Sequence, residues 1–286
     1  MTVATRSDKP ALTAVALFLD VDGTLLEIAA TPQAVSVSGD LREGLRALFR
    51  GTGGAVALVS GRAITDLDAL FAPLTLPSAG LHGFEHRGAS GDYRRRPLPS
   101  AAALEDARRA MLQLAEQHAG LLVEDKRFAL ALHYRNAPRL EDTVMKAMGE
   151  VAARLAGELE LQRGKMVAEL RPVGVTKAEA VAAFLAEAPF AGRLPIFIGD
   201  DLTDEPAFEL VNRLDGLSVV VNATRPSAAR ARLADVTGVH GWLAQLQAEP
   251  SAALRRLSDR DHGASDCDHS DPSRAAQHGP PLRSRV

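Results

Sequence analysis

Residues 16–27 read ALFLDVDGTLLE, and this stretch decides the fold that we expect for the chain. Four apolar residues run into Asp20, and a second carboxylate, Asp22, follows two positions later. A continuous apolar run is typical of a parallel strand covered on both faces, so we expect a buried strand over Val15–Leu19. Ligands of open parallel sheets bind beyond the carboxyl ends of the strands, and the two acids stand at such an end.

Three further apolar runs predict buried strands of the same kind, at Ala55–Val59, Ile196–Ile198 and Leu217–Val221. Helical patterns lie between and after them, around residues 40–50, 63–71, 176–187, 205–214 and 239–247. Alternation of strands and helices favours an α/β fold. We therefore expect a Rossmann-like parallel sheet core with helices on both faces.

The middle of the chain follows a different pattern. In RFALALHYR (127–135), Leu130 and Leu132 alternate with Ala131 and His133, and GKMVAELRP (164–172) alternates in the same way. Such strands belong to a sheet with one buried and one polar face, commonly antiparallel. Two amphipathic helical patterns, at about 100–118 and 139–156, would cover the apolar face. The pattern predicts an α+β cap domain inserted into the core.

These patterns divide the chain into a core of residues 12–84 and 172–248 and a cap of residues 85–171. Residues 1–11 and 249–286 are polar or lack a hydrophobic period, so we expect both ends to be disordered.

Composition narrows the class of protein. The 286 residues are 46% hydrophobic and 4% aromatic, with a formal net charge of -3, so neither nucleic acid nor an anionic membrane is an expected partner. Cys267 is the single cysteine, which fits a reducing compartment. No apolar run reaches the roughly 18 residues of a membrane span, and the run at 11–19 ends in acids without a cleavage site. We expect a cytoplasmic monomer that acts on a small molecule.

Polar side chains follow the other core strands as well. Ser60 follows Ala55–Val59, Lys177 opens a helix, and the loop GDDLTDE (199–205) follows Ile196–Ile198. Clustered carboxylates without histidine or cysteine favour a hard cation such as Mg²⁺, which in proteins usually works with substrate phosphate. Ser60 and Lys177 would then hold the remaining phosphate oxygens. The sequence thus predicts a phosphoryl-transfer site at this edge of the sheet.

Asp20 and Asp22 project to the same side of an extended chain, which suits one nucleophile and one proton carrier. Each residue also has a plain structural explanation. Asp-x-Asp-Gly occurs in turns, Ser60 fits a turn, Lys177 fits a helix surface, and Asp204 fits an N-cap before Pro206. Their shared position at strand ends and helix starts argues for the catalytic interpretation.

The stretches DVDGTL, VSGR, TK and GDDLTDE resemble, in order and context, the motifs of the haloacid-dehalogenase superfamily of phosphatases. The resemblance implies that Asp20 is the nucleophile, Asp22 the general acid/base, and Ser60 and Lys177 the phosphate-holding residues. It also implies a Mg²⁺ site formed by Asp20, the Asp22 carbonyl and Asp200, with Asp201 or Asp204 in a supporting position.

Longer stretches, among them GLHGFEHR (80–87) and VEDKRFALALHYRNAP (123–138), resemble trehalose-6-phosphate phosphatases. GKMVAELRPVGVTKAEA (164–180) and PIFIGDDLTDEPAF (195–208) extend the similarity, which runs from about residue 14 to 246. The resemblance implies that Glu124, Lys126 and Glu169 bind sugar. Weaker assignments fall on Arg135, Lys165, Glu85 and Arg87.

These observations predict hydrolysis of trehalose 6-phosphate through an aspartyl phosphate. Other readings remain open at this point. A phosphatase for another sugar phosphate such as sucrose phosphate, a mutase, and a non-catalytic sugar-phosphate sensor share the fold. The polar cap face also fits a solvated sheet with cross-strand ion pairs.

Overall fold

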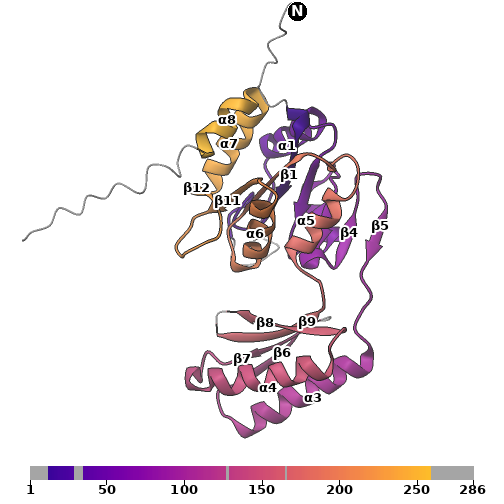
Figure 1. The fold of residues 1–286 in the computed structure, drawn as a ribbon, viewed down its shortest axis with the longest axis vertical. Coiled ribbons are helices and arrows are strands. Elements are labelled where there is room, and N and C mark those ends of the chain that lie inside the picture. The colour runs from indigo at the N-terminus through magenta and orange to yellow at the C-terminus, as the bar shows by residue number, and fades with distance from the viewer. Residues whose placement is uncertain (1–11, 29–34, 127–128, 165, 259–286) are drawn as a thin grey trace, which may run out of the picture.

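A computed structural model of the chain describes residues 12–28, 35–126, 129–164 and 166–258. Its two parts are each built on one sheet, and two stretches of chain connect them, one after β5 and one after β9 (Figure 1). No helix within the described ranges is long and apolar enough to cross a membrane.

The larger part contains an eight-stranded sheet in the order β12-β11-β10-β1-β2-β3-β4-β5. The neighbours from β12 to β3 pair in parallel, and β4 and β5 continue antiparallel. The strands are β1 (Val15–Leu19), β2 (Val56–Val59), β3 (Ser78–Gly80), β4 (Glu85–Arg87), β5 (Tyr93–Arg95), β10 (Leu194–Gly199), β11 (Leu217–Val221) and β12 (Ala231–Leu233). The predicted parallel core is confirmed.

Helices cover both faces of this sheet. Along β1, Val15, Leu17 and Leu19 enter one apolar cluster, whereas Ala16 and Phe18 enter the other. The first cluster packs against α1 (Gly39–Gly51), α2 (Ile64–Phe71), α7 (Val236–Ala248) and α8 (Pro250–Ser258), and the second against α5 (Lys177–Leu185) and α6 (Glu205–Arg213). Because β1 is covered on both faces, only its end is open to polar chemistry.

The smaller part is the predicted α+β cap. Its antiparallel sheet has the order β6-β7-β9-β8, formed by β6 (Leu122–Lys126), β7 (Ala129–His133), β9 (Val167–Pro172) and β8 (Leu159–Gly164). Helices α3 (Ala101–Gln117) and α4 (Glu141–Arg154) pack on the face that buries Leu130, Leu132 and Leu170. The opposite face, which carries Glu169, is turned toward the core (Figure 1).

The expected boundary of the cap at residue 85 is wrong, because β4 and β5 belong to the core sheet. Glu85 accepts a hydrogen bond of 2.8 Å from the Ile64 amide at the start of α2. Arg87 forms two hydrogen bonds of 2.7 Å to Asp68 of the same helix. These three-residue strands are too short and too charged to show a hydrophobic period, so the sequence pattern did not reveal them. Because they belong to the core sheet, the inserted part begins only after Arg95.

The expected disorder of residues 249–286 is also wrong at its beginning. Residues 250–258 form α8, and its Leu257 is 1% exposed in the core. Trp242 of α7 donates its indole N–H to the Ala253 carbonyl at 3.0 Å. In PSAALRRLS (250–258) serines and arginines interrupt the few apolar residues, so the sequence shows no clear hydrophobic period for this helix. Residues 1–11 and 259–286 lie outside the described residues.

Replacing Leu257 by alanine should lower the free energy of unfolding by about 2–4 kcal/mol, because it leaves a cavity under α8. Chemical denaturation measures the change. The exposed neighbour Arg255 provides the control, since its replacement by alanine should stay within about 0.5 kcal/mol. Equal losses in both variants would mean that α8 does not dock on the core.

Candidate active site

A lysine and two aspartates form the centre of the carboxyl edge. Asp20 follows β1 and is 4% exposed, and Lys177 is the first residue of α5 and 3% exposed. The Lys177 ammonium donates to Asp20 Oδ1 at 2.7 Å and to Asp204 Oδ1 at 2.6 Å. The structure thus joins the end of β1, the start of α5 and the loop after β10 through one buried cation.

Asp204 holds the loop after β10 in place. It is fully buried, and its Oδ2 accepts the amide N–H groups of Asp200 at 3.0 Å and Asp201 at 2.9 Å. The expected role of Asp204 as the side-chain cap of α6 is wrong, because that helix start has no side-chain cap hydrogen bond. The carboxylate instead orders the short helix η5 (Leu202–Asp204) and fixes Asp200 beside Asp20.

The turn after Asp22 is shaped by a glycine. Gly23 has φ +82°, and a Cβ atom there would lie 2.1 Å from Asp200 Oδ2. Any other residue would displace the Asp200 carboxylate. The next residue, Thr24, is buried, and its hydroxyl donates to Asp20 Oδ2 at 3.2 Å and lies 3.5 Å from Asp200 Oδ1.

Burial dominates the electrostatics of this cluster. It raises the pKa of Asp20 to about 6 and that of Asp204 to about 6, against the lowering effect of Lys177. Burial also raises the pKa of Asp200. For Lys177 burial alone would lower the pKa, but the charges of Asp20 and Asp204 outweigh it and raise the value. Repulsion among the three carboxylates adds to the rise in their pKa values, because they lie close together around a single ammonium group.

The cluster fits a hard divalent cation. One oxygen from each of Asp20, Asp200 and Asp204 lies within 4.8 Å of the others, and no histidine or cysteine belongs to this group in the described part of the chain. Carboxylate oxygens alone suit Mg²⁺ rather than a softer metal. Asp204 is fully buried and accepts three hydrogen bonds, whereas Asp20 accepts two and Asp200 is only partly buried. Asp20 and Asp200 are consequently the carboxylates best placed to bind the ion.

Asp22 lies apart from this cluster in a pair with Arg62. The guanidinium donates from Nε to Asp22 Oδ2 at 2.7 Å and from a terminal nitrogen to Oδ1 at 2.6 Å. Ser60 follows β2, is 1% exposed, and its Oγ accepts the Arg62 amide N–H at 3.1 Å. The predicted proton carrier is therefore engaged by both of its oxygens in a pair with Arg62.

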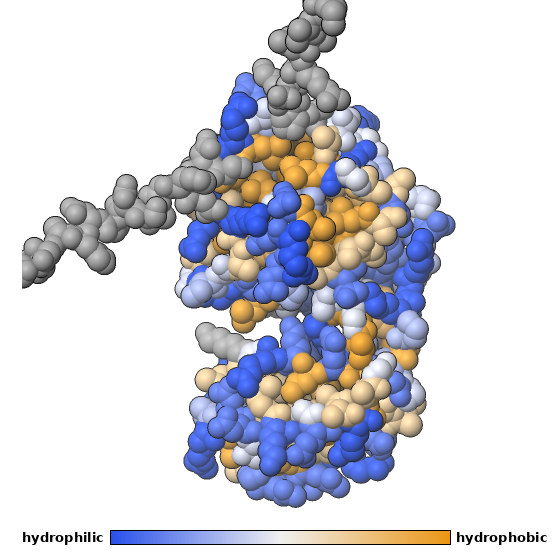
Figure 2. Space-filling view, viewed as in Figure 1, coloured by the Kyte–Doolittle hydropathy of each residue, from blue (hydrophilic) through white to orange (hydrophobic). Residues whose placement is uncertain are grey.

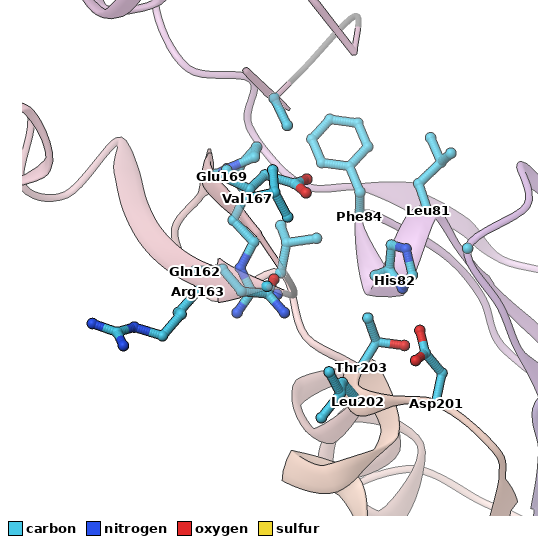
Figure 3. Close-up of a pocket in the computed structure, with 16 residues that line it drawn as sticks. Leu81, His82, Phe84, Gln162, Arg163, Val167, Glu169, Asp201, Leu202 and Thr203 are labelled. Atoms are coloured by element: carbon cyan, nitrogen blue, oxygen red, sulfur yellow. The ribbon is translucent and has the colours of Figure 1, made fainter. Parts of the chain in front are cut away.

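A cavity of about 540 Å³ lies between the core loops and the polar face of the cap. Figure 3 shows residues from both parts around it, and Figure 2 shows the surface hollowed between them. It meets the catalytic edge at Gly61 and Asp201, each adjacent to a predicted site residue. Its other lining residues are Leu81, His82, Phe84, Ala129, Gln162, Arg163, Gly164, Val167, Glu169, Arg171, Pro172, Val175, Leu202 and Thr203.

The cap contributes a row of side chains across its polar face. The strand register places Glu124 opposite Ala131, Ala131 opposite Glu169, and Glu169 opposite Gln162. Glu124 and Glu169 are two strands apart, which separates their backbones by roughly 10 Å. Ala131 lies between them in the register and is 0% exposed, so neighbouring side chains cover its methyl group.

The other predicted sugar-binding residues are placed differently. The backbone of Lys126 ends β6, but its side chain lies outside the described structure, and Lys165 lies outside the described residues. Arg135 is exposed in the turn after β7 and is not among the described residues that line the cavity. The weaker assignments Glu85 and Arg87 are used in fastening α2 to β4.

Sequence reasoning assigned no role to four residues of the site. Arg62 stands in VSGR, where only the serine received a role. Leu81 (φ 50°) and His82 (φ 59°) both adopt the left-handed conformation in the cavity wall, a strain typical of functional sites. Gln162 faces the cavity from β8, a strand without a clear alternating pattern. Arg62 alone carried a signal, as a cation next to a predicted phosphate-holding serine.

The parallel core, the buried Asp–Lys centre and the inserted cap together define a phosphatase fold of the haloacid-dehalogenase type. A Bacteroides thetaiotaomicron protein described among phosphatases of the haloalkanoate (HAD) superfamily has this fold, with a TM-score of 0.56 at 19% identity over 87% of this chain and 98% of that one. The predicted fold class is confirmed.

Comparison of sequences identifies the family. The profile of the trehalose-phosphatase family matches residues 18–237. The trehalose-6-phosphate phosphatase of Escherichia coli K12 is 44% identical over 231 residues, covering 81% of this chain and 86% of that protein. A probable trehalose-phosphate phosphatase of Sinorhizobium fredii is 43% identical over 232 residues, covering 81% and 87%. The chain belongs to the trehalose-phosphatase family.

A solved structure supports the same placement. The Aspergillus fumigatus trehalose-6-phosphate phosphatase is 25% identical, with a TM-score of 0.69 over 81% of this chain and 92% of that chain.

The raised pKa values of the cluster predict a pH-dependent stability in the metal-free protein. Folded Asp20 and Asp204 keep a proton up to about pH 6, whereas unfolded aspartate loses it near 3.8. The folded state therefore binds more protons in this window, and their contribution makes the free energy of unfolding fall as pH rises from about 4 to about 6. Asp204→Asn should flatten that slope, as measured by urea unfolding in EDTA.

Asp40→Asn, at an exposed position in α1, is the matched control and should keep the wild-type slope. A slope that Asp204→Asn leaves unchanged would show that Asp204 is already ionised in the folded protein at the acid end of the window.

Proposed function

We propose that this protein is a Mg²⁺-dependent phosphatase that hydrolyses trehalose 6-phosphate to trehalose and inorganic phosphate. The observation that carries the proposal is the buried Asp20–Lys177 pair at the carboxyl edge of the core sheet, an edge that meets at Gly61 and Asp201 a cavity whose far wall is the polar face of the cap. Family membership and the 44% identity to the Escherichia coli enzyme support this choice of substrate.

Asp20 is the proposed nucleophile. Its Oδ1 is held by Lys177, so Oδ2, which Thr24 contacts, is the oxygen directed to phosphorus. Attack forms the Asp20–phosphorus bond as the bond from phosphorus to the sugar 6-oxygen breaks. Lys177 offsets negative charge on the phosphoryl oxygens, since such transfers depend mainly on positioning and electrostatics. Bound Mg²⁺, held by Asp20, Asp200 and the Asp22 carbonyl, would supply further positive charge there.

Asp22 is the proposed proton carrier, and its pair with Arg62 must open for this role. A phosphate dianion offers a guanidinium the same two-point hydrogen bonding as a carboxylate. Arrival of the substrate phosphate therefore gives Arg62 a second partner and releases Asp22. Once released, Asp22 takes up a proton from solvent and donates it to the departing 6-oxygen, and it then takes a proton from the water that cleaves the aspartyl phosphate.

The cap is proposed to select the sugar. Carboxylates accept hydrogen bonds from hydroxyl groups, and ammonium and guanidinium groups donate to them. Glu124 and Glu169 are the proposed acceptors, and Lys126, Lys165 and Arg135 are the proposed donors. Ser60 completes the phosphate-binding end of the site.

A panel of phosphate esters tests this function. We expect the highest kcat/KM for trehalose 6-phosphate when it is compared with sucrose 6-phosphate, glucose 6-phosphate and a mannosyl phosphate. EDTA should abolish release of phosphate, and Mg²⁺ should restore it better than the larger Ca²⁺. A better substrate in the panel would overturn the choice of sugar, and binding without phosphate release would indicate a sensor.

The two aspartates should fail at different steps. Asp20→Asn should lower kcat by at least about 10³-fold, because the amide cannot attack phosphorus. Asp22→Asn should still become phosphorylated by p-nitrophenyl phosphate, whose leaving group needs no proton, and should then accumulate phosphoenzyme. Trapping with labelled substrate and acid quench distinguishes the two. Phosphoenzyme in Asp20→Asn, or full turnover of trehalose 6-phosphate by Asp22→Asn, would contradict these roles.

A further inference from the structure

Of the two glutamates on the polar face of the cap, Glu169 lines the cavity, and His133 contacts the other, Glu124. His133 Nε2 and Glu124 Oε2 are 2.8 Å apart. A carboxylate at neutral pH can only accept, so the ring nitrogen donates the hydrogen bond. The two residues come from neighbouring strands, because β6 pairs with β7, and they are not directly opposite, since the partner of Glu124 is Ala131.

His133 shares the polar face of the cap with the cavity wall. Along β7, residues 129, 131 and 133 alternate with the buried Leu130 and Leu132, so they project to one side. Ala129 lines the cavity, and Ala131, which is fully buried, lies in register between Glu124 and Glu169. The hydrogen bond therefore lies at the margin of the surface proposed to bind sugar.

The pair is poorly placed to stabilise the fold. The side chains of His133 and Glu124 are 34% and 49% exposed, and exposed pairs of this kind contribute roughly 0–1 kcal/mol to folding. The contact instead restricts rotation of the Glu124 carboxylate about its terminal bond. With Oε2 held by His133, Oε1 is presented in a fixed direction, which reduces the entropy lost when a hydroxyl group binds to it.

We propose that His133 is a positioning residue that orients Glu124 for recognition of a sugar hydroxyl distant from the phosphate. This inference rests on the proposed function, since it concerns the same substrate site. It assigns a role in substrate affinity to a residue that touches neither the phosphate-binding edge nor the Asp–Lys centre.

Three single variants test the proposal with the intact protein. His133→Leu should raise KM for trehalose 6-phosphate about fivefold, the effect of one hydrogen bond, while kcat changes by less than about twofold. His133→Gln places an amide N–H near the position of Nε2 and should restore most of the affinity. His118→Leu makes the same exchange beyond the end of α3, on the apolar side of the sheet, and should match the wild type. Circular dichroism and thermal unfolding verify that each variant is folded.

Two further measurements separate positioning from a general effect. The KM for p-nitrophenyl phosphate, which has no sugar hydroxyl for Glu124 to bind, should be the same for His133→Leu as for His118→Leu. In a double-mutant cycle, His133→Leu should add little to the KM of Glu124→Ala, because the histidine acts through that carboxylate. Additive effects, an unchanged KM in His133→Leu, or no recovery in His133→Gln would overturn the proposal.

Failure of the proposal for His133 can be distinguished from failure of the proposed function. If another sugar phosphate proves the best substrate of the wild type, the choice of trehalose 6-phosphate fails, and the same variants are compared on that ester. A loss of affinity confined to sugar esters then still supports the role of His133. If the wild type hydrolyses p-nitrophenyl phosphate as efficiently as every sugar ester, both proposals are wrong.

Discussion

The site depends on one buried ammonium group. Lys177 lies between Asp20 and Asp204, and each contact joins a different segment of the chain to the start of α5. Truncating one member of such a buried set leaves an uncompensated charge, which costs several kcal/mol. The same contacts that assemble this edge thus make it costly to take apart, and they fix the proposed nucleophile before any substrate arrives.

A contrast in burial separates the two aspartates of the opening motif. Asp20 is buried against a fixed partner, whereas the Asp22 side chain is 38% exposed and paired with the guanidinium of Arg62. A nucleophile must keep one direction, and a proton carrier must change partners during the reaction. The turn at Gly23 allows Asp20 and Asp22 to have such different surroundings. Because glycine has no side chain, the backbone of this turn comes close to Asp200.

Hydrophobic periodicity predicted the elements whose burial is regular. Val15–Leu19 and Leu217–Val221 are covered on both faces, and Leu130 and Leu132 alternate toward the cap helices, so the pattern follows directly from packing. It could not predict β4 and β5, whose short charged strands are held by contacts to α2 and to each other. Pairs such as Asp22–Arg62 and Glu124–His133 depend on strand register and side-chain conformation, which no spacing in a single sequence specifies.

The chain from the last cap strand to the catalytic lysine is short. β9 ends at Pro172 and α5 begins at Lys177, so five residue steps join the cap sheet to the edge of the core that carries Lys177. Fully extended, those steps span at most about 18 Å. However the cap moves, this edge of its sheet remains tethered within that radius of Lys177. The length of this segment therefore limits how far from a bound phosphate the groups next to Pro172 can lie when they contact a sugar.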